Sequence, residues 1–326
     1  MNGLPQYFIE LKPNYSCNQA CPFCWFADCS RTKMEASDIV ANLAFLLAHL
    51  RTPREPSAVH LRISGGEFTI RSDHLDLLDV ICCMGFASTV LHTNAITCAD
   101  LAVARALGAR VGQMYVAYHS YDQASHEFAS GGRTRWRDVL NGIANLKSVG
   151  CTIMTNTLIM RHNVERLPLL ARQLADLKVD VCAFNFPVPK ARCAVHADEL
   201  IVRSIEQARM PLREARLILE SAGVEFVLTD WAGFPACWRE RLVPEEGDER
   251  VYEELLPRVI LVDAEHQYAQ ATNLFAMQFE DDIVSTSEMA ECRYCTKLPV
   301  CKGVHRLLRG RAGFELAPIS QPRAGG

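Results

Sequence analysis

Three cysteines near the start of the chain have a spacing that suits an iron–sulfur cluster. Cys17, Cys21 and Cys24 lie in CNQACPFC, with C-x3-C-x2-C spacing. Such a loop can hold one face of an iron–sulfur cube and leaves one iron without a protein ligand, whereas most electron-transfer clusters take four cysteines. The spacing therefore predicts chemistry at the cluster. A zinc site, which usually takes four ligands, and three buried thiols in a proline-containing loop are the alternatives.

The composition places this motif in a reducing compartment. The chain has 326 residues and 14 cysteines, and its first residues, MNGLPQYFIELK, lack the basic and apolar regions of a secretory signal. A cytoplasmic location, where thiols stay reduced, is therefore expected. The apolar run over 39–50 is too short for a membrane span, and the net charge of −4 favours neither nucleic acid nor an anionic membrane. We expect no nucleic-acid or membrane partner.

The cysteine loop follows the first of six predicted strands. Runs rich in β-branched residues predict strands at 7–11, 58–64, 87–93, 111–118, 151–159 and 179–186. Between them, helical periods place apolar residues on one face: Ile39, Leu43, Leu46 and Leu50; Leu75, Leu78 and Cys82; Val139, Ile143 and Leu146; Leu167, Leu170 and Leu174. Cys82 and Cys83 are expected to be buried. The alternation predicts an α/β fold, a partial (β/α)6 TIM-type barrel with a parallel sheet.

The alternation is predicted to stop near residue 222, where the composition changes. Residues 223–326 carry 11 Lys and Arg against 17 Asp and Glu, with an acidic stretch, PEEGDERVYEE, and a Pro- and Gly-rich end, APISQPRAGG. We therefore divide the chain into a barrel over 1–222, a small irregular domain over 223–317 and a disordered tail over 318–326.

Together these features resemble the radical S-adenosylmethionine (SAM) enzymes. The cysteine motif follows the first strand and has Phe23 directly before its third cysteine. The sequence Ser64-Gly65-Gly66-Glu67 follows the second strand, where that family carries Gly-Gly-Glu. The six βα units match the family's partial barrel, and the resemblance covers roughly residues 5–220.

The resemblance implies two cofactors at the first cysteine loop, a [4Fe–4S] cluster and SAM. The amino and carboxylate groups of SAM would chelate the open iron, and the backbone of Gly65 and Gly66, with Glu67, would hold the amino group. An electron from a donor such as flavodoxin or ferredoxin would cleave SAM reductively. The resulting 5′-deoxyadenosyl radical would abstract a hydrogen atom from the substrate.

Polar side chains at the strand ends are the remaining cofactor candidates. Residues of this kind lie at or just beyond predicted strand ends: Asn94, His119, Asn156, Arg161 and Asn185. Each is as easily explained as a satisfied structural group. Gln113, Tyr115, Ala117 and His119 share one face of the fourth strand, which predicts that they point into the barrel. We take Phe23, His119 and Asn156 as candidate SAM contacts.

A second cysteine group resembles part of the signature of a SPASM or Twitch extension, which binds auxiliary clusters in a subset of radical SAM enzymes. Cys292, Cys295 and Cys301 have C-x2-C-x5-C spacing, and Cys237 precedes them in GFPACW. The full signature has another cysteine where this chain has His305, and its Gly-x4-Cys is absent. The four cysteines predict one auxiliary [4Fe–4S] cluster. An open or His305-ligated cluster and zinc are the alternatives.

The sequence thus predicts an oxidoreductase that abstracts hydrogen and passes the remaining electron to the auxiliary cluster. We expect a secondary-metabolite substrate of the aminosugar or nucleoside type, because the chain begins at the first barrel strand without a preceding peptide-recognition domain. The alternatives are a maturase that crosslinks or epimerises a ribosomal peptide, and a small-molecule epimerase. In the epimerase, Cys193 in the PVPKARC loop would return a hydrogen atom. A non-catalytic iron–sulfur carrier is a further alternative.

Overall fold

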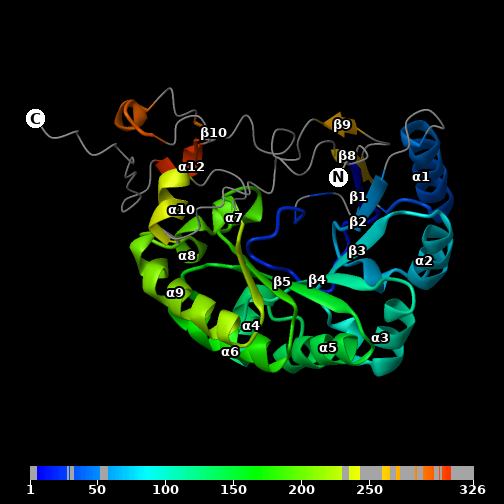
Figure 1. Ribbon diagram of the computed structural model, residues 1–326, viewed down its shortest axis with the longest axis horizontal. Helices are drawn as coiled ribbons and strands as arrows, with labels where there is room; N and C mark the ends of the chain where they lie inside the picture. Colours follow the sequence, from blue (N-terminus) through cyan, green and yellow to red (C-terminus); the bar gives the residue numbers. More distant parts are fainter. Residues whose placement is uncertain are drawn as a thin grey trace, which may run out of the picture.

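One curved sheet of nine strands forms the centre of the computed structural model, which describes residues 6–27, 29, 33–51, 58–229, 235–242, 259–264, 269–271, 283–284, 289–296, 301 and 303–309. The strands are β1 (Gln6–Lys12), β2 (Ala58–Ile63), β3 (Ser88–Thr93), β4 (Gln113–Ala117), β5 (Thr152–Leu158), β6 (Val181–Asn185), β7 (Glu225–Leu228), β8 (Val259–Asp263) and β9 (Ala269–Ala271). Their order is β7-β6-β5-β4-β3-β2-β1-β8-β9, and only β9 runs antiparallel to its neighbour (Figure 1). The described strands form an open parallel sheet, which confirms the predicted partial barrel.

Helices cover the outer side of this sheet (Figure 1). Those with a face in the main core include α1 (Ala36–Leu50), α2 (His74–Cys83), α3 (Leu101–Gly108), α5 (Trp136–Ser148), α6 (Leu167–Asp176) and α9 (Glu206–Ser221). The other described helices are α4 (Gln123–Ser130), α7 (Arg192–Val195), α8 (Ala197–Leu200), α10 (Ala236–Leu242) and α12 (Arg306–Arg309). Short 3-10 turns are η1 (Phe68–Ile70), η2 (Thr97–Ala99), η3 (Val164–Arg166) and η6 (Ala290–Cys292), and β10 (Ile283–Val284) pairs with β11 (Val304–His305). The apolar faces predicted for α5 and α6 are buried in the core.

The predicted face of α2 is wrong. The helix buries Leu77, Leu78 and Ile81 against the sheet, and Cys82 and Cys83 are exposed. At 100° per residue, the positions one and two residues past Ile81 turn away from the core. The two thiols are therefore surface groups and not small core residues.

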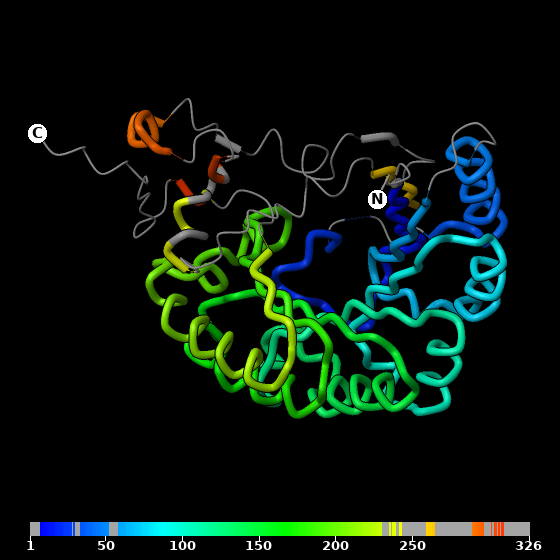
Figure 2. The backbone as a smooth tube through the Cα atoms, viewed as in Figure 1, coloured from blue at the N-terminus to red at the C-terminus, as the bar shows by residue number. Residues whose placement is uncertain are grey.

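The two faces of each strand have different environments. Ile9 and Leu11 of β1 are fully buried in the main core, whereas Glu10 and Lys12 lie on the other face of the same strand. In β4 the same alternation buries Met114 and leaves its neighbours partly exposed, as the sequence predicts. Residues 13–27 cross this inner face as the blue segment of Figure 2.

The sheet extends past the predicted boundary at residue 222. Strand β7 pairs with β6 at one edge, and β8 pairs with β1 near the other. The prediction that the alternation of helix and strand stops near 222 is therefore wrong at β7, a four-residue edge strand too short to show a clear period. The division into domains stays a prediction, and the tail over 318–326 lies outside the described residues.

The described C-terminal segments that contain 289–292 and 304–308 pack against the barrel at α8. Met289, Cys292, Val304 and Leu308 form a small apolar cluster with residues of and beside α8, Ala197 and Ile201. Within the described residues, no helix has the length and apolar character that crossing a membrane requires.

Candidate functional site

The SGGE turn after β2 is hydrogen-bonded to the first cysteine loop. Gly66 N donates to Asn14 O at 2.8 Å, and Glu67 N donates to Ser16 O at 2.9 Å. A Cβ atom on Gly66 would lie 2.2 Å from Ser16 O, and one on Gly65, whose φ is +103°, would lie 2.7 Å from Asn14 O. Only glycine fits at these positions. The two glycines therefore let the turn approach the loop closely, which fixes the loop relative to the sheet.

The three thiols of this loop interact with one another. Cys24 N donates to Cys21 O at 3.2 Å, and Cys17 Sγ accepts from Gln19 N at 3.4 Å. Burial raises the pKa of Cys17 to about 11, and burial together with the Cys24 and Cys17 thiols raises the pKa of Cys21. Iron binding must therefore displace protons from these thiols. In the described part of the chain no three His, Cys, Asp or Glu side chains are already placed around a metal position.

Glu67 is bonded entirely to protein groups. Its Oε1 accepts from Thr69 N at 3.1 Å, Thr69 Oγ1 at 2.7 Å and Thr93 Oγ1 at 3.0 Å, and its Oε2 accepts from Asn94 N at 2.7 Å. The side chain is 2% exposed, and burial raises the pKa of the carboxyl while the four donors oppose that shift. The carboxylate thus ties the end of β2 to the end of β3. Its predicted contact with the amino group of SAM stays a prediction.

Asn94 links the hydrogen bonds of Glu67 to the cysteine loop. Its Nδ2 donates to Asn18 Oδ1 at 2.6 Å and lies 4.0 Å from Cys17 Sγ, while its backbone N–H is held by Glu67. The sequence placed Asn94 among several polar residues at strand ends, with nothing to separate it from the others. Its pairing with Asn18, far away in the sequence, is visible only in three dimensions.

His119 and Phe23 pack against each other at the mouth of β4. Their ring centroids are 4.8 Å apart in an edge-to-face arrangement, and His119 Nδ1 accepts from Leu158 N at 3.1 Å. Burial, with smaller contributions from His162 and His126, lowers the pKa of His119 to about 3. The imidazole is therefore neutral at physiological pH. Its neutral ring positions Phe23, one residue before the third cysteine of the loop.

Asn156 lies on the inner face of β5, and its contact with SAM stays a prediction. It is in register with Ala117 of β4 and Ala183 of β6. The side-chain oxygens of Asn156 and of Asn185, at the end of β6, are buried and accept no hydrogen bond. Two unsatisfied buried acceptors at neighbouring strand ends are typical of a site that a ligand with N–H or O–H groups completes.

Cys193 lies beside the cysteine loop but is fully buried. It packs in α7 with Phe23, Met160 and Leu200, and Cys21 packs against the same cluster. Its exposed fraction is 0%. The prediction placed this thiol over an open barrel mouth, which differs from what the structure shows. Its role as a hydrogen-atom donor stays a prediction, and its burial counts against that role.

The four C-terminal cysteines lie in three described stretches of the chain, with Cys292 and Cys295 in one turn. Cys237 lies in α10 and Cys292 in η6, and Cys295 N donates to Cys292 O at 2.9 Å. Burial raises the pKa of Cys292, and the thiols of Cys301, Cys237 and Cys295 raise it further, in that order. All three other thiols therefore lie near Cys292. The side chain of His305 lies outside the described residues.

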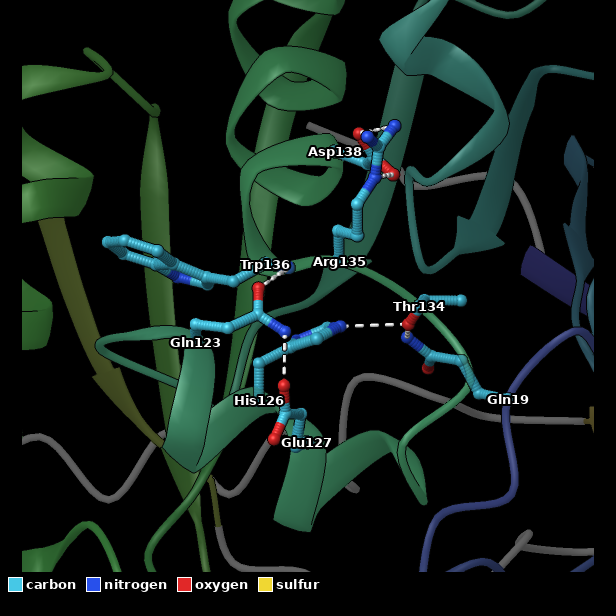
Figure 3. A network of polar contacts seen from close by, with 8 residues as sticks. All are labelled: Gln19, Gln123, His126, Glu127, Thr134, Arg135, Trp136 and Asp138. Carbon is cyan, nitrogen blue, oxygen red and sulfur yellow. Dashed lines mark hydrogen bonds and ion pairs between the residues drawn. The ribbon is translucent and has the colours of Figure 1, made fainter.

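A hydrogen-bond network joins the cysteine loop to the segment between α4 and α5 (Figure 3). Gln19 Nε2 donates to Thr134 Oγ1 at 3.2 Å, and the same oxygen lies 2.8 Å from His126 Nε2. The backbone adds a bond from Ala20 N to Ser130 O at 2.8 Å. Beside the network is a groove of about 410 Å³, lined by Gln123, Arg135, Trp136, Arg137, Asp138 and Asn141. Sequence reasoning did not find this surface.

Comparisons with known proteins agree with this geometry. Residues 11–174 match the Radical SAM superfamily. The crystal structure of Streptococcus suis SuiB bound to S-adenosylmethionine is similar over 98% of this chain and 77% of that chain, with a TM-score of 0.63 and 13% identity. Native anSMEcpe with bound AdoMet is similar over 97% of this chain and 93% of that chain, with a TM-score of 0.64 and 11% identity. At these identities the two structures establish the shared fold.

Proposed function

Because the chain belongs to the radical SAM superfamily, we propose that it is an enzyme whose [4Fe–4S] cluster is held by Cys17, Cys21 and Cys24. SAM at the open iron supplies, after one-electron reduction, a 5′-deoxyadenosyl radical that abstracts a hydrogen atom from the substrate. The observation that carries this proposal is the loop itself. Its backbone is bonded to the SGGE turn, and its three thiols interact with one another.

The other residues of the site orient the cofactor and exclude water. Glu67 and Asn94 hold the loop against the ends of β2 and β3, and the Phe23–His119 pair closes the β4 side. The unsatisfied Oδ1 of Asn156 would accept a hydrogen bond from an amino or hydroxyl group of SAM. The contacts made by Glu67, Asn94 and the Phe23–His119 pair are already present without the cofactor.

The test measures 5′-deoxyadenosine after anaerobic reconstitution with iron and sulfide and addition of SAM and dithionite. We expect product from the wild type and only background from Cys24→Ala. A wild type that binds iron but makes no 5′-deoxyadenosine would instead support a non-catalytic electron carrier.

A second [4Fe–4S] cluster is proposed on Cys237, Cys292, Cys295 and Cys301. Support comes from the three thiols that raise the pKa of Cys292. Four protein ligands leave no open iron, so this cluster is suited to accepting an electron. The substrate would lose a hydrogen atom to the radical, an electron to this cluster and a proton to solvent. SAM and substrate would thus give methionine, 5′-deoxyadenosine, an oxidised product and a proton.

Product mass and deuterium content separate oxidation from epimerisation. Oxidation gives a product lighter by two hydrogen atoms, whereas epimerisation leaves the mass unchanged in normal water and adds one deuterium in heavy water. We expect oxidation. A product of unchanged mass with one solvent deuterium, absent for Cys193→Ala, would instead support the epimerase.

Two substrate classes are proposed for this site. The first is the secondary metabolite of the aminosugar or nucleoside type. The second is a ribosomal peptide, which is favoured by similarity to SuiB bound to its precursor peptide SuiA, with a TM-score of 0.60 and 14% identity over 98% of this chain. Stimulation of 5′-deoxyadenosine formation above the uncoupled rate, measured with panels of each class, decides between them.

The electron donor is proposed to be an acidic carrier of the flavodoxin or ferredoxin type that docks on the segment between α4 and α5. Arg133 in this segment and Arg137 in the first turn of α5 are exposed, and neither forms an ion pair with the described residues. Ser130, the last residue of α4, accepts a hydrogen bond from Ala20 N of the cysteine loop. Opposite charges would steer an acidic carrier to this position, close to the cluster.

Charge reversal tests this docking site. Arg133→Glu with Arg137→Glu should slow reduction by flavodoxin at low salt by about tenfold, because steering depends on charge. Reduction by dithionite should not change. Arg105→Glu, at an exposed arginine on α3, is the matched control. Equal slowing by the control, or no slowing by the pair, would reject this surface.

A further inference from the structure

Lys12 is a buried cation to which the described part of the chain offers no hydrogen-bond acceptor. It ends β1 on the inner face of the sheet and is 4% exposed. Among the described residues, none accepts a hydrogen bond from its Nζ or forms an ion pair with it within 4.0 Å. The Nζ atom lies over the ring of Phe26, 5.0 Å from the ring centroid. A buried ammonium in this state is costly unless another molecule supplies its partner.

The neighbouring carboxylates do not fill this role. Glu10 pairs with Arg62 at 3.4 Å and accepts a short hydrogen bond from Ser64. Asp263 is in register with Lys12 on β8 but lies beyond ion-pair distance. Burial lowers the pKa of Lys12, which outweighs the opposing effect of Glu10 and Asp263. The neighbouring groups therefore compensate the positive charge of the Lys12 ammonium only in part.

A second cation lies on the next strand. The Arg62 side chain is 25% exposed on the inner face of β2. Burial, followed by Arg62 and Lys12, keeps the pKa of His92 on β3 well below its usual value, which places all three basic groups near one another. His92 also stacks on Tyr115 of β4 at 4.4 Å.

Lys12, Arg62 and His92 form a basic patch on the inner face of the sheet, and this patch adjoins the SGGE turn. A Cβ atom on Gly65 would lie 3.3 Å from Lys12 Cβ, so the turn rests directly on the end of β1. The cations on β1 and β2 therefore lie beside the SGGE turn, where the proposed function would place SAM.

We propose that Lys12 and Arg62 form an oxyanion site on the inner wall, which binds a carboxylate or phosphate group of the molecule that reacts at the cluster. This inference deepens the proposed function and rests on it. The oxyanion has two possible sources, the substrate and the carboxylate of SAM. In either case it completes the coordination of Lys12 and leaves the Glu10–Arg62 pair in place.

The first experiment is Lys12→Met, which replaces the ammonium with an apolar side chain of similar size. If Lys12 awaits a ligand, removing its charge should raise the Tm of the ligand-free protein by about 2–4 °C. If Lys12 is a structural ion-pair residue, the Tm should fall, and the proposal is wrong. Lys33→Met, at an exposed lysine, is the control and should leave the Tm unchanged.

The second experiment measures oxyanion binding to the reconstituted, SAM-loaded protein with inorganic phosphate and acetate as probes. Either anion should raise the Tm of the wild type and of Lys12→Arg, but not of Lys12→Met. Unchanged SAM affinity in Lys12→Met would assign the site to the substrate. A tenfold loss of affinity for SAM, but not for decarboxylated SAM, would assign it to the SAM carboxylate.

An identical response of wild type and Lys12→Met to phosphate, acetate and SAM would overturn the proposal. Formation of 5′-deoxyadenosine by the wild type is recorded in the same preparation. Loss of the oxyanion site can thereby be distinguished from failure of the proposed radical SAM activity.

Discussion

The two cysteine regions of this chain are held in different ways. The N-terminal loop is bonded to the barrel by backbone hydrogen bonds from Gly66 and Glu67 and by the side chain of Asn94. Cys237, the Cys292–Cys295 turn and Cys301 come from different stretches of the chain, and Cys292 is held in a six-residue apolar cluster beside α8. The first region is positioned by the sheet, whereas among the described residues of the second only Cys237 and Cys292 lie in helices, both of them short.

This difference suggests a division of roles. A loop fixed by the protein can keep one iron open, because the geometry does not depend on a fourth ligand. A set of thiols from separate segments gains its order from the metal, since metal binding then supplies part of the folding free energy. Iron removal should therefore affect activity at the first region and local structure at the second.

Removal of the three N-terminal thiols should have the largest effect. The triple variant Cys17→Ala, Cys21→Ala, Cys24→Ala should lose about half of the bound iron and all SAM cleavage, because SAM loses its iron. Iron analysis and 5′-deoxyadenosine assays measure this. The Tm should change little, because the loop is held by backbone bonds. Retained SAM cleavage would contradict the assignment.

Removal of one C-terminal thiol should leave SAM cleavage intact and abolish substrate oxidation. Cys292→Ala should still form 5′-deoxyadenosine without substrate but should lose the oxidised product. Limited proteolysis should also cut the segment around 289–309 faster than in the wild type, because the cluster no longer orders it. Unchanged proteolysis together with normal product would remove the case for a second cluster.

The glycine turn provides a smaller, structural test of the first region. Gly66→Ala places a Cβ atom 2.2 Å from Ser16 O and should cost about 2–3 kcal/mol of stability, with reduced SAM cleavage. Gly112→Ala is the matched control, because a Cβ atom there has no neighbour within 4 Å. Thermal unfolding of both variants measures the effect. Equal stability would mean that the turn can move away from the loop.

The last of these predictions concerns pH. Because the pKa of His119 is lowered from 6.5 to about 3, the unfolded chain binds a proton below pH 6.5 that the folded chain does not. Stability should therefore fall as the pH drops through this window, by up to about 1.4 kcal/mol per unit. Unfolding of iron-free His119→Gln should be less pH-dependent than that of wild type, whereas exposed His49→Gln should match wild type. A steeper dependence for His119→Gln would contradict the burial argument.

The sequence predicted the parts of the fold that carry strong local signals. All six predicted strands are present, because each has a run of β-branched residues and a helix after it. The missed strand, β7, has only four residues, and β8 pairs with β1 from more than two hundred residues away. Local patterns contain no information about such a partner.

The candidate site shows the same limit. Cysteine spacing identified both thiol groups, since ligand spacing is local. Tertiary contacts determine the hydrogen bonds of Glu67 to Thr93 and Asn94. They also determine the burial of the Lys12 ammonium, to which the described residues offer no hydrogen-bond acceptor. Cys193 is buried and Cys82 is exposed, the reverse of what the sequence predicts, because burial depends on which face of a helix meets the core.

The response of the iron to SAM tests the central claim most directly. In anaerobically reconstituted protein we expect about eight irons in two [4Fe–4S] clusters, with SAM changing the Mössbauer spectrum of one cluster only. That cluster should be absent from the triple variant of Cys17, Cys21 and Cys24. An iron content near four, or a SAM-induced change in both clusters, would contradict the distinction between an open N-terminal and a closed C-terminal site.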